Sequence, residues 1–363
     1  MKARFATMLF AATLTLAAHP ANAQWRILAA PTQANLGAVS AVDDMAAWAA
    51  GASGTVVRTE DGGRSWKVCA PSMGDVGVGA IEAFDKDTAI VMTTGGGRRS
   101  ALYKTSDGCR TWKKVLENPD QGGGFKALRR ESGFDVYLLG DPVDGKFVVY
   151  VSRNGGESWT RDQDPGLAAP EGSRVAGPGA LTNVLSLISF GTTGAAASIY
   201  TYAPICHAGH CSLGWSSRAI PQAAGNAPGE ILSLAGRNVM VQATGTVTGI
   251  GTMPATTIVA IGDEAAEHKQ GWAYYSGDGG LGWKAASAAP GGRRSAVAFD
   301  GDRGRFIAVG EEGTDSSVDD GLIWQPLRPR EGEAADADKG WSALSLPFVV
   351  GAHGRIGRLS DAP

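Results

Sequence analysis

The chain has 363 residues, and its 33 lysines and arginines against 36 aspartates and glutamates give a formal net charge of −3 at pH 7. This weakly acidic balance argues against a nucleic-acid-binding protein, because such proteins present a net basic face to the phosphate backbone. The 52 glycines and the scarcity of long amphipathic helical patterns favour many short strands joined by tight turns.

Residues 1–23 are predicted to be a secretory signal peptide. Lys2 and Arg4 precede an apolar run over residues 5–18, and Ala21-Asn22-Ala23 has the small-x-small pattern of a cleavage site. The run is short for a bilayer span, so we expect cleavage rather than an uncleaved anchor. No other stretch is apolar enough to cross a membrane. We therefore expect residues 24–363 to form one domain in the periplasm or outside the cell.

An eight-residue pattern recurs five times in that domain, as TEDGGRSW (59–66), TSDGCRTW (105–112), SRNGGESW (152–159), SGDGGLGW (276–283) and SVDDGLIW (317–324). Each copy has a hydroxyl residue at position 1, Asp or Asn at position 3 and Trp at position 8, and four copies have Gly at position 5. These residues are Thr59, Asp61, Gly63, Trp66, Thr105, Asp107, Trp112, Ser152, Asn154, Gly156, Trp159, Ser276, Asp278, Gly280, Trp283, Ser317, Asp319, Gly321 and Trp324.

Each position of the pattern has a physical role in a turn between two strands. The short Asp or Asn side chain accepts hydrogen bonds from the amides of its own turn, as the hydroxyl does from the strand end. Gly supplies a positive φ, and Trp begins the next strand and buries its ring. Cys109 stands where the other copies have Gly, so we expect the second turn to differ in detail.

The spacing of the tryptophans predicts a seven-bladed β-propeller, an all-β fold. Each of seven tryptophans precedes a short strand-like run and a proline, and a blade of four antiparallel strands takes roughly 40–50 residues. The seven are Trp25, Trp66, Trp112, Trp159, Trp215, Trp283 and Trp324. Blades four and five are irregular, and blade five carries an insertion over residues 245–269.

The two ends of the pattern predict how the ring closes. AAGASGTVVRT (49–59) is similar to VVGAHGRIGRL (349–359), but only the first is followed by the repeat and its tryptophan. QWRILAAP (24–31) is an outermost strand without a blade of its own. We therefore expect this N-terminal strand to complete the last blade, which removes two open sheet edges.

The repeat resembles the Asp-box, or bacterial neuraminidase repeat, of sialidases, two-propeller xyloglucanases and sortilin-type receptors. The longer pattern AWAAGASGTVVRTEDGGRSW is most similar to the photosystem II stability/assembly factor family, including relatives in non-photosynthetic bacteria. The resemblance covers nearly the whole domain. It implies a non-catalytic propeller that binds proteins during assembly of a membrane complex, with the repeat aspartates as structural residues.

A sialidase-like glycosidase is the alternative from another class, and a glycan-binding propeller without turnover is a third. Such an enzyme needs an arginine cluster, a Tyr–Glu pair and an Asp acid/base in the central pocket. Arg26-Ile27-Leu28 is superficially similar to the early Arg-Ile-Pro motif of sialidases. The predicted closure, however, places Arg26 on an outermost strand, and we find no convincing Tyr–Glu pair. We expect no catalysis and no cofactor.

Four cysteines in an exported chain suggest two disulfides. Cys206 and Cys211 are close enough in sequence to close a small loop, which leaves Cys69 and Cys109 for each other. The alternative for Cys206-His207-Ala208-Gly209-His210-Cys211 is a soft-metal site. We favour the disulfide, because the ligands are crowded and the compartment oxidises thiols, and we expect no metal.

Arginine pairs are the candidate partner-binding residues. Arg98-Arg99 and Arg293-Arg294 fall in loops that should open on one face of the propeller, opposite the repeat turns, whereas Arg129-Arg130 should face the other way. Exposed arginines suit carboxylates and acidic protein segments, although they can also be ordinary solvated charge. We predict a monomer that binds a protein partner in the cell envelope through Arg98, Arg99, Arg293 and Arg294.

Overall fold

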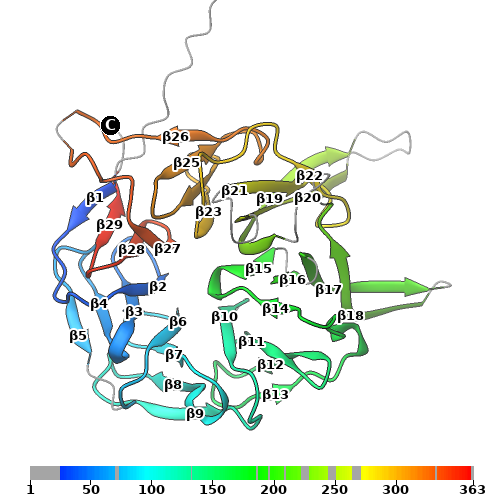
Figure 1. Ribbon diagram of the computed structural model, residues 1–363, viewed down its shortest axis with the longest axis horizontal. Helices are drawn as coiled ribbons and strands as arrows, with labels where there is room; N and C mark the ends of the chain where they lie inside the picture. The colour runs from blue at the N-terminus through cyan, green and yellow to red at the C-terminus, as the bar shows by residue number, and fades with distance from the viewer. Residues whose placement is uncertain are drawn as a thin grey trace, which may run out of the picture.

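The computed structural model describes residues 25–69, 73–131, 133–184, 187–194, 197–207, 210–221, 229–243, 251–263, 271–331 and 333–360. Seven antiparallel sheets stand around a central axis as the blades of a propeller (Figure 1). This confirms the predicted fold class. The predicted signal peptide lies outside the described residues.

The strands follow one another from the axis outward in each blade. Blade one comprises β2 (Leu36–Ala41), β3 (Ala47–Gly51), β4 (Val56–Thr59) and β5 (Lys67–Cys69). Blade two comprises β6 (Val78–Ala83), β7 (Ala89–Thr93), β8 (Ala101–Thr105) and β9 (Lys113–Glu117). Blade three comprises β10 (Phe125–Arg130), β11 (Val136–Val143), β12 (Lys146–Ser152) and β13 (Thr160–Arg161). Blade four comprises β14 (Arg174–Val175), β15 (Leu181–Val184), β16 (Leu187–Thr193), β17 (Ser198–His207) and β18 (His210–Ala219).

The remaining blades repeat this order. Blade five comprises β19 (Glu230–Ala243), β20 (Gly251–Asp263), β21 (Gly271–Ser276) and β22 (Lys284–Ala285). Blade six comprises β23 (Ala296–Asp300), β24 (Arg305–Val309), β25 (Thr314–Ser317) and β26 (Gln325–Leu327). Blade seven comprises β27 (Trp341–Ser345), β28 (Phe348–Gly351), β29 (Ile356–Leu359) and β1 (Trp25–Leu28).

The core lies between neighbouring blades. The second strand of a blade is covered on both faces, so β3 (AWAAG) and β7 (AIVMT) are continuous apolar runs with every residue buried. The outermost strand has a neighbour on one side only, and β5 (KVC) buries just Cys69. Serines of the innermost strands also link blades: the amides of Ala41 and Ala83 each donate a 3.0 Å hydrogen bond to a serine Oγ of the preceding blade.

The N-terminal strand completes the last blade, as predicted. β1 pairs with β29, and Trp25 lies opposite Leu359. The Trp25 ring is 1% exposed, its centroid lies 6.1 Å from that of Trp341, and its Nε1 donates a 3.3 Å hydrogen bond to Thr314 Oγ1 in blade six. The first described strand therefore joins blades six and seven.

The five repeat turns share one hydrogen-bond pattern. In the first turn, Gly63 N donates to Thr59 Oγ1 at 3.0 Å and Ser65 N donates to Asp61 Oδ1 at 2.9 Å. Asn154 accepts in the same way in the third turn. These turns join the third and fourth strands of their blades, so they lie on one face of the ring, which we call the turn face. The opposite face, which carries the connections between blades, is the loop face.

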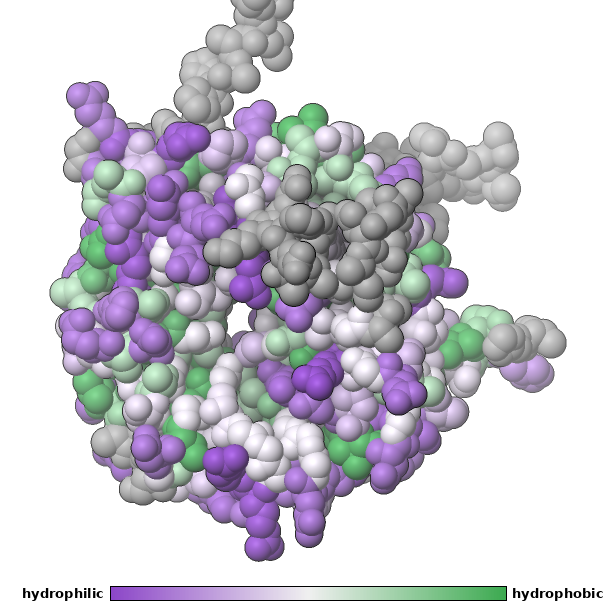
Figure 2. Space-filling model, viewed as in Figure 1, coloured by the Kyte–Doolittle hydropathy of each residue, from purple (hydrophilic) through white to green (hydrophobic). Residues whose placement is uncertain are grey.

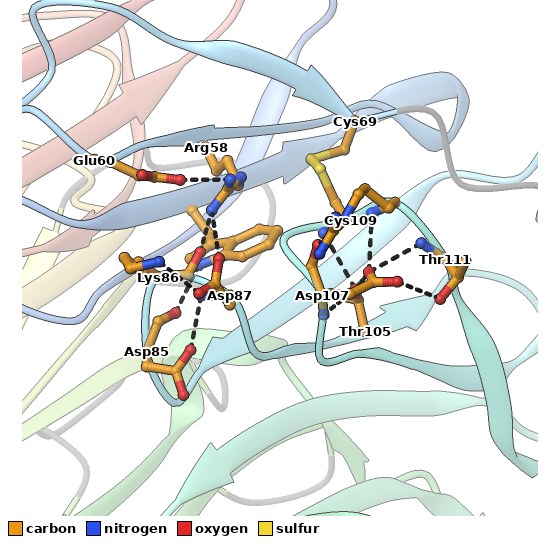
Figure 3. The surroundings of a disulfide bond; sticks show 12 residues. Arg58, Glu60, Cys69, Asp85, Lys86, Asp87, Thr105, Asp107, Cys109 and Thr111 are labelled. Atoms are coloured by element: carbon orange, nitrogen blue, oxygen red, sulfur yellow. Dashed lines mark hydrogen bonds and ion pairs between the residues drawn. A yellow bond between two sulfur atoms is a disulfide. The ribbon is translucent and has the colours of Figure 1, made fainter.

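The second turn keeps this geometry in spite of Cys109, contrary to expectation. Cys109 adopts φ +66°, and its amide donates to Thr105 Oγ1 at 3.2 Å. Its Sγ is bonded to Cys69 of β5, so the disulfide joins blade one to blade two (Figure 3). The second predicted disulfide, Cys206–Cys211, is also present.

Blades four and five depart from the regular blade, as predicted. β17 and β18 are ten residues each, and their hairpin projects outward from the ring (Figure 1). β19 and β20 have fourteen and thirteen residues. Of the predicted insertion over 245–269, residues 245–250 and 264–269 lie outside the described residues, and the part between them forms β20.

Candidate functional site

A channel of about 680 Å³ runs along the propeller axis and is lined by the innermost strands of all seven blades. Figure 2 shows the hollow at the centre of one face. Most lining side chains are small or apolar. The charged lining residues are Glu82, Arg129, Arg130, Glu131 and Arg293.

These charges lie at two different mouths. Each innermost strand begins after a connection between blades and ends before the hairpin to its second strand, so all of them run from the loop face to the turn face. Arg129 and Arg130 end β10 and therefore lie at the turn-face mouth. Arg293 precedes β23 and lies at the loop-face mouth.

Three of the four arginines predicted to bind a partner are exposed on the loop face. Arg98 and Arg99 lie in a short 3-10 segment (Gly97–Arg99) between β7 and β8. The Arg98 side chain is 89% exposed, and its Nε lies 3.0 Å from Glu117 Oε1. The Arg293 side chain is 52% exposed, and its Nε lies 2.7 Å from Asp263 Oδ2.

The prediction that Arg294 is an exposed anchor is wrong. Its side chain is 4% exposed, and Nη2 lies 2.5 Å from Oδ2 of Asp315, which is 1% exposed. Nε donates to the same carboxylate oxygen at 2.6 Å. This buried pair ties the segment before β23 to β25 inside blade six, so Arg294 is not available to a partner.

The arginines at the turn-face mouth have a different environment. Arg129 Nε lies 3.5 Å from Asn183 Oδ1, and the Asn183 amide donates to the Glu131 carbonyl at 2.8 Å. The Arg130 guanidinium lies 5.3 Å from the Phe84 ring centroid and donates to the Phe84 carbonyl at 3.3 Å. Within the described part of the chain, no carboxylate lies within 4.0 Å of either guanidinium, unlike those of Arg98, Arg293 and Arg294.

Glu82 lines the channel beside this arginine pair. Burial raises the pKa of its carboxyl above the ordinary value, although the charges of Arg129 and Arg130 and the Arg130 backbone amide act in the opposite direction. The turn-face mouth thus presents two guanidinium groups that have no carboxylate within 4.0 Å among the described residues, and guanidinium groups bind carboxylates with directed hydrogen bonds.

Arg129-Arg130 was predicted to face the other way from Arg98-Arg99 and Arg293-Arg294, and these two residues were not among the predicted partner-binding residues. The signal that could have found them is their place at the end of FKALRR, an innermost strand. Residues there meet at the axis with those of the other blades. The lack of nearby carboxylates depends on neighbouring blades and is not visible in a local pattern.

The arrangement expected of a sialidase is not found among the described residues. Arg26 lies on the outermost strand β1, is exposed, and is opposite Arg358, as the predicted closure required. The channel arginines are divided between the two mouths, so no three of them converge.

The described residues contain no cluster of three or more His, Cys, Asp or Glu side chains that could hold a metal ion. Cys206 and Cys211 are opposite each other in register, so His210, next to Cys211 on its strand, projects from the other face of the hairpin. No helix in this part of the chain is long and apolar enough to cross a membrane.

Comparisons with known proteins find similarity in structure. No family model and no curated protein matches the chain. A solved structure of YCF48 bound to D1 peptide has a TM-score of 0.60 and 15% identity over 95% of this chain and 99% of that chain. YCF48 from Cyanidioschyzon merolae has a TM-score of 0.61 and 16% identity over 92% and 98%.

An enzyme structure is also similar, over less of its length. An ancestral GH74 enzyme has a TM-score of 0.57 and 15% identity over 86% of this chain and 41% of that chain. At these identities the comparisons establish the fold and not the activity. In fold, the chain is a seven-bladed β-propeller similar to YCF48 from end to end, which confirms the resemblance to photosystem II stability/assembly factors at that level.

Proposed function

We propose that the protein is a non-catalytic binding module exported to the cell envelope, where it acts as an assembly or stability factor for a membrane-protein complex. It binds a carboxylate-bearing segment of its client at the turn-face mouth of the channel. The observation that carries the proposal is the pair Arg129 and Arg130, whose guanidinium groups have no carboxylate within 4.0 Å among the described residues.

The lengths of the similar proteins support a binding module over an enzyme. The chain matches nearly the full length of both YCF48 chains, one of which was solved with a peptide bound. It spans less than half of the GH74 enzyme. A client carboxylate at Arg129 and Arg130 would gain charge-assisted hydrogen bonds, while the rigid ring is already organised to present both side chains.

The test is crosslinking of the tagged protein in the cell envelope, followed by identification of the captured client. R129E/R130E should lose the client, because the inverted charges repel a carboxylate. R98E/R99E makes the same charge change at an exposed pair on the loop face and is the matched control, which should retain the client. Loss in the control with retention in R129E/R130E would overturn the placement of the site.

Glu82 supplies a second readout for the same site. Because burial raises its pKa, the Glu82 carboxyl gains a proton at a higher pH than an ordinary glutamate does. Protonation removes its negative charge, so the turn-face mouth becomes more positive as pH falls. Binding of an isolated client segment should therefore strengthen below neutral pH in the wild type. The client's own carboxylates titrate in both proteins, so the E82Q variant should keep only their contribution and lose the strengthening that protonation of Glu82 adds in the wild type.

A glycoside hydrolase is the second candidate, and the observation that favours it is the buried carboxyl of Glu82 in the channel, because burial raises its pKa in the direction that a general acid needs. Glu131 lines the same channel and would be the second carboxylate. Turnover of sialosides or xyloglucan that is abolished in E82Q would replace the binding proposal.

A further inference from the structure

The β17–β18 hairpin is the largest departure from the repeat in blade four. Where five other blades join their third and fourth strands by the eight-residue turn, this blade extends two ten-residue strands that project beyond the ring (Figure 1). Cys206 and Cys211 lie near its tip and are both exposed. Leu213, on the same face of the hairpin as Cys211, is 62% exposed.

The two disulfides of the protein differ in their surroundings. Cys69 and Cys109 are 3% and 8% exposed, are 40 residues apart in sequence and join two blades. Asp107 in the same turn is ionised at neutral pH, since its hydroxyl and amide donors lower its pKa to about 2 (Figure 3). An approaching thiolate is therefore blocked by burial and repelled by charge.

Neither barrier protects the Cys206–Cys211 bond. Both residues are exposed, and the hairpin from Ser198 to Ala219 contains no Asp or Glu. The bond also adds little constraint, because it spans five residues in a hairpin whose backbone is already paired from Ser198↔Ala219 to His207↔His210. The stabilisation from closing a loop grows with the length of the loop.

We propose that Cys206–Cys211 is a thiol–disulfide exchange site for a protein dithiol, a function beyond the proposed client binding. A thiolate of the partner attacks one hairpin sulfur, forms a mixed disulfide, and releases the other hairpin cysteine as a thiolate. The second thiol of the partner then attacks the mixed disulfide. Two electrons pass to the hairpin, which becomes a dithiol with its two protons, and the partner becomes the disulfide. Leu213 offers the partner an apolar contact beside the reacting sulfurs.

The first test uses dithiothreitol as the probe on the intact protein, with alkylation of free thiols and peptide mass spectrometry after increasing times. Cys206 and Cys211 should be alkylated on the order of tenfold faster than Cys69 and Cys109. The melting temperature should remain nearly unchanged when only the hairpin bond is open. Equal rates at the two bonds, or melting of the propeller on reduction of the hairpin bond, would overturn the proposal.

A trapping variant tests for a biological partner. In C211S, Cys206 is a free thiol that can attack the disulfide form of the partner, which is the reverse of the proposed step, and no second hairpin thiol can then resolve the mixed disulfide. We expect a reductant-sensitive adduct with a thiol protein in cells, absent from the matched C206S/C211S double variant. If C211S forms no such adduct, the exchange role is wrong. Because R129E/R130E leaves the hairpin unchanged, loss of client binding in that variant with the adduct intact separates the two proposals.

Discussion

At the scale of single residues, the acids of the repeat turns act as hydrogen-bond acceptors of their own backbone. The side chain and amide of Ser65 lower the pKa of Asp61 to about 2, and Thr111 does the same for Asp107. Both residues are partly exposed and bond mainly within their own turns, so their role is local: they hold the turn that leads to the tryptophan. Asn154 shows that a neutral amide oxygen can serve in the same position.

Two substitutions at Asp61 distinguish the loss of its hydrogen-bond acceptor from the loss of its negative charge. A depressed pKa contributes stability that is present above the unfolded value of 3.8 and is lost as pH falls toward 2. We expect D61A to lower the melting temperature at pH 7 by more than D61N, which keeps an acceptor oxygen as Asn154 does. D61N should also have a shallower loss of stability between pH 4 and pH 2 than the wild type. Equal melting temperatures for D61A and the wild type would contradict the role of this side chain.

At the scale of elements, a buried ion pair and a buried disulfide join strands that the repeat alone would not join. The Arg294–Asp315 pair ties the entry of β23 to β25, and the Cys69–Cys109 bond ties β5 to the next blade. A buried ion pair is costly to break, because removal of one partner leaves the other charged and unsolvated.

Removal of the Arg294 side chain should therefore be strongly destabilising. We expect R294A to lower the free energy of unfolding by about 3–5 kcal/mol, measured by urea denaturation monitored by fluorescence. R98A removes an arginine that is 89% exposed and should change it by less than about 0.5 kcal/mol. A small effect of R294A would mean that Asp315 finds another partner or water.

At the scale of the whole molecule, the ring is closed by non-covalent contacts between its two ends. Trp25 is the centre of this closure, since it packs on Trp341 and is hydrogen-bonded to Thr314. Arg26, the next residue on the same strand, is exposed. The closure thus depends on the buried face of β1, which carries Trp25, and not on the exposed face that carries Arg26.

The difference between the two faces of β1 predicts different effects of W25A and R26A on stability. W25A should lower the free energy of unfolding by about 3–5 kcal/mol, as expected for loss of a buried aromatic ring. R26A should have little effect under the same conditions, because its side chain packs in no core. If the two variants were equally stable, β1 would not be the element that closes the ring.

The fold could be predicted from the sequence because a propeller repeats its chemistry. The tryptophans mark the blades, and the similarity of residues 49–59 to 349–359 identifies the strand that closes the ring. Two features could not be predicted. In Arg293-Arg294 both residues have the same local pattern, and only the position of Asp315, 21 residues away, decides that the second is buried. Arg129 and Arg130 come to line the channel only when seven innermost strands meet.

The pairing of β1 with β29 also has a consequence for how the protein is made. β1, the first described strand to emerge in synthesis, pairs with β29, so it stays unpaired until β29 has been synthesised. Blades built from neighbouring strands can form early, because their contacts are local in sequence, whereas the closing contact must wait and is intrinsically slow. An open, incomplete ring exposes the edges of β1 and β28 to other chains during that interval. Protection of the nascent chain by a chaperone would matter most just before the final strand arrives.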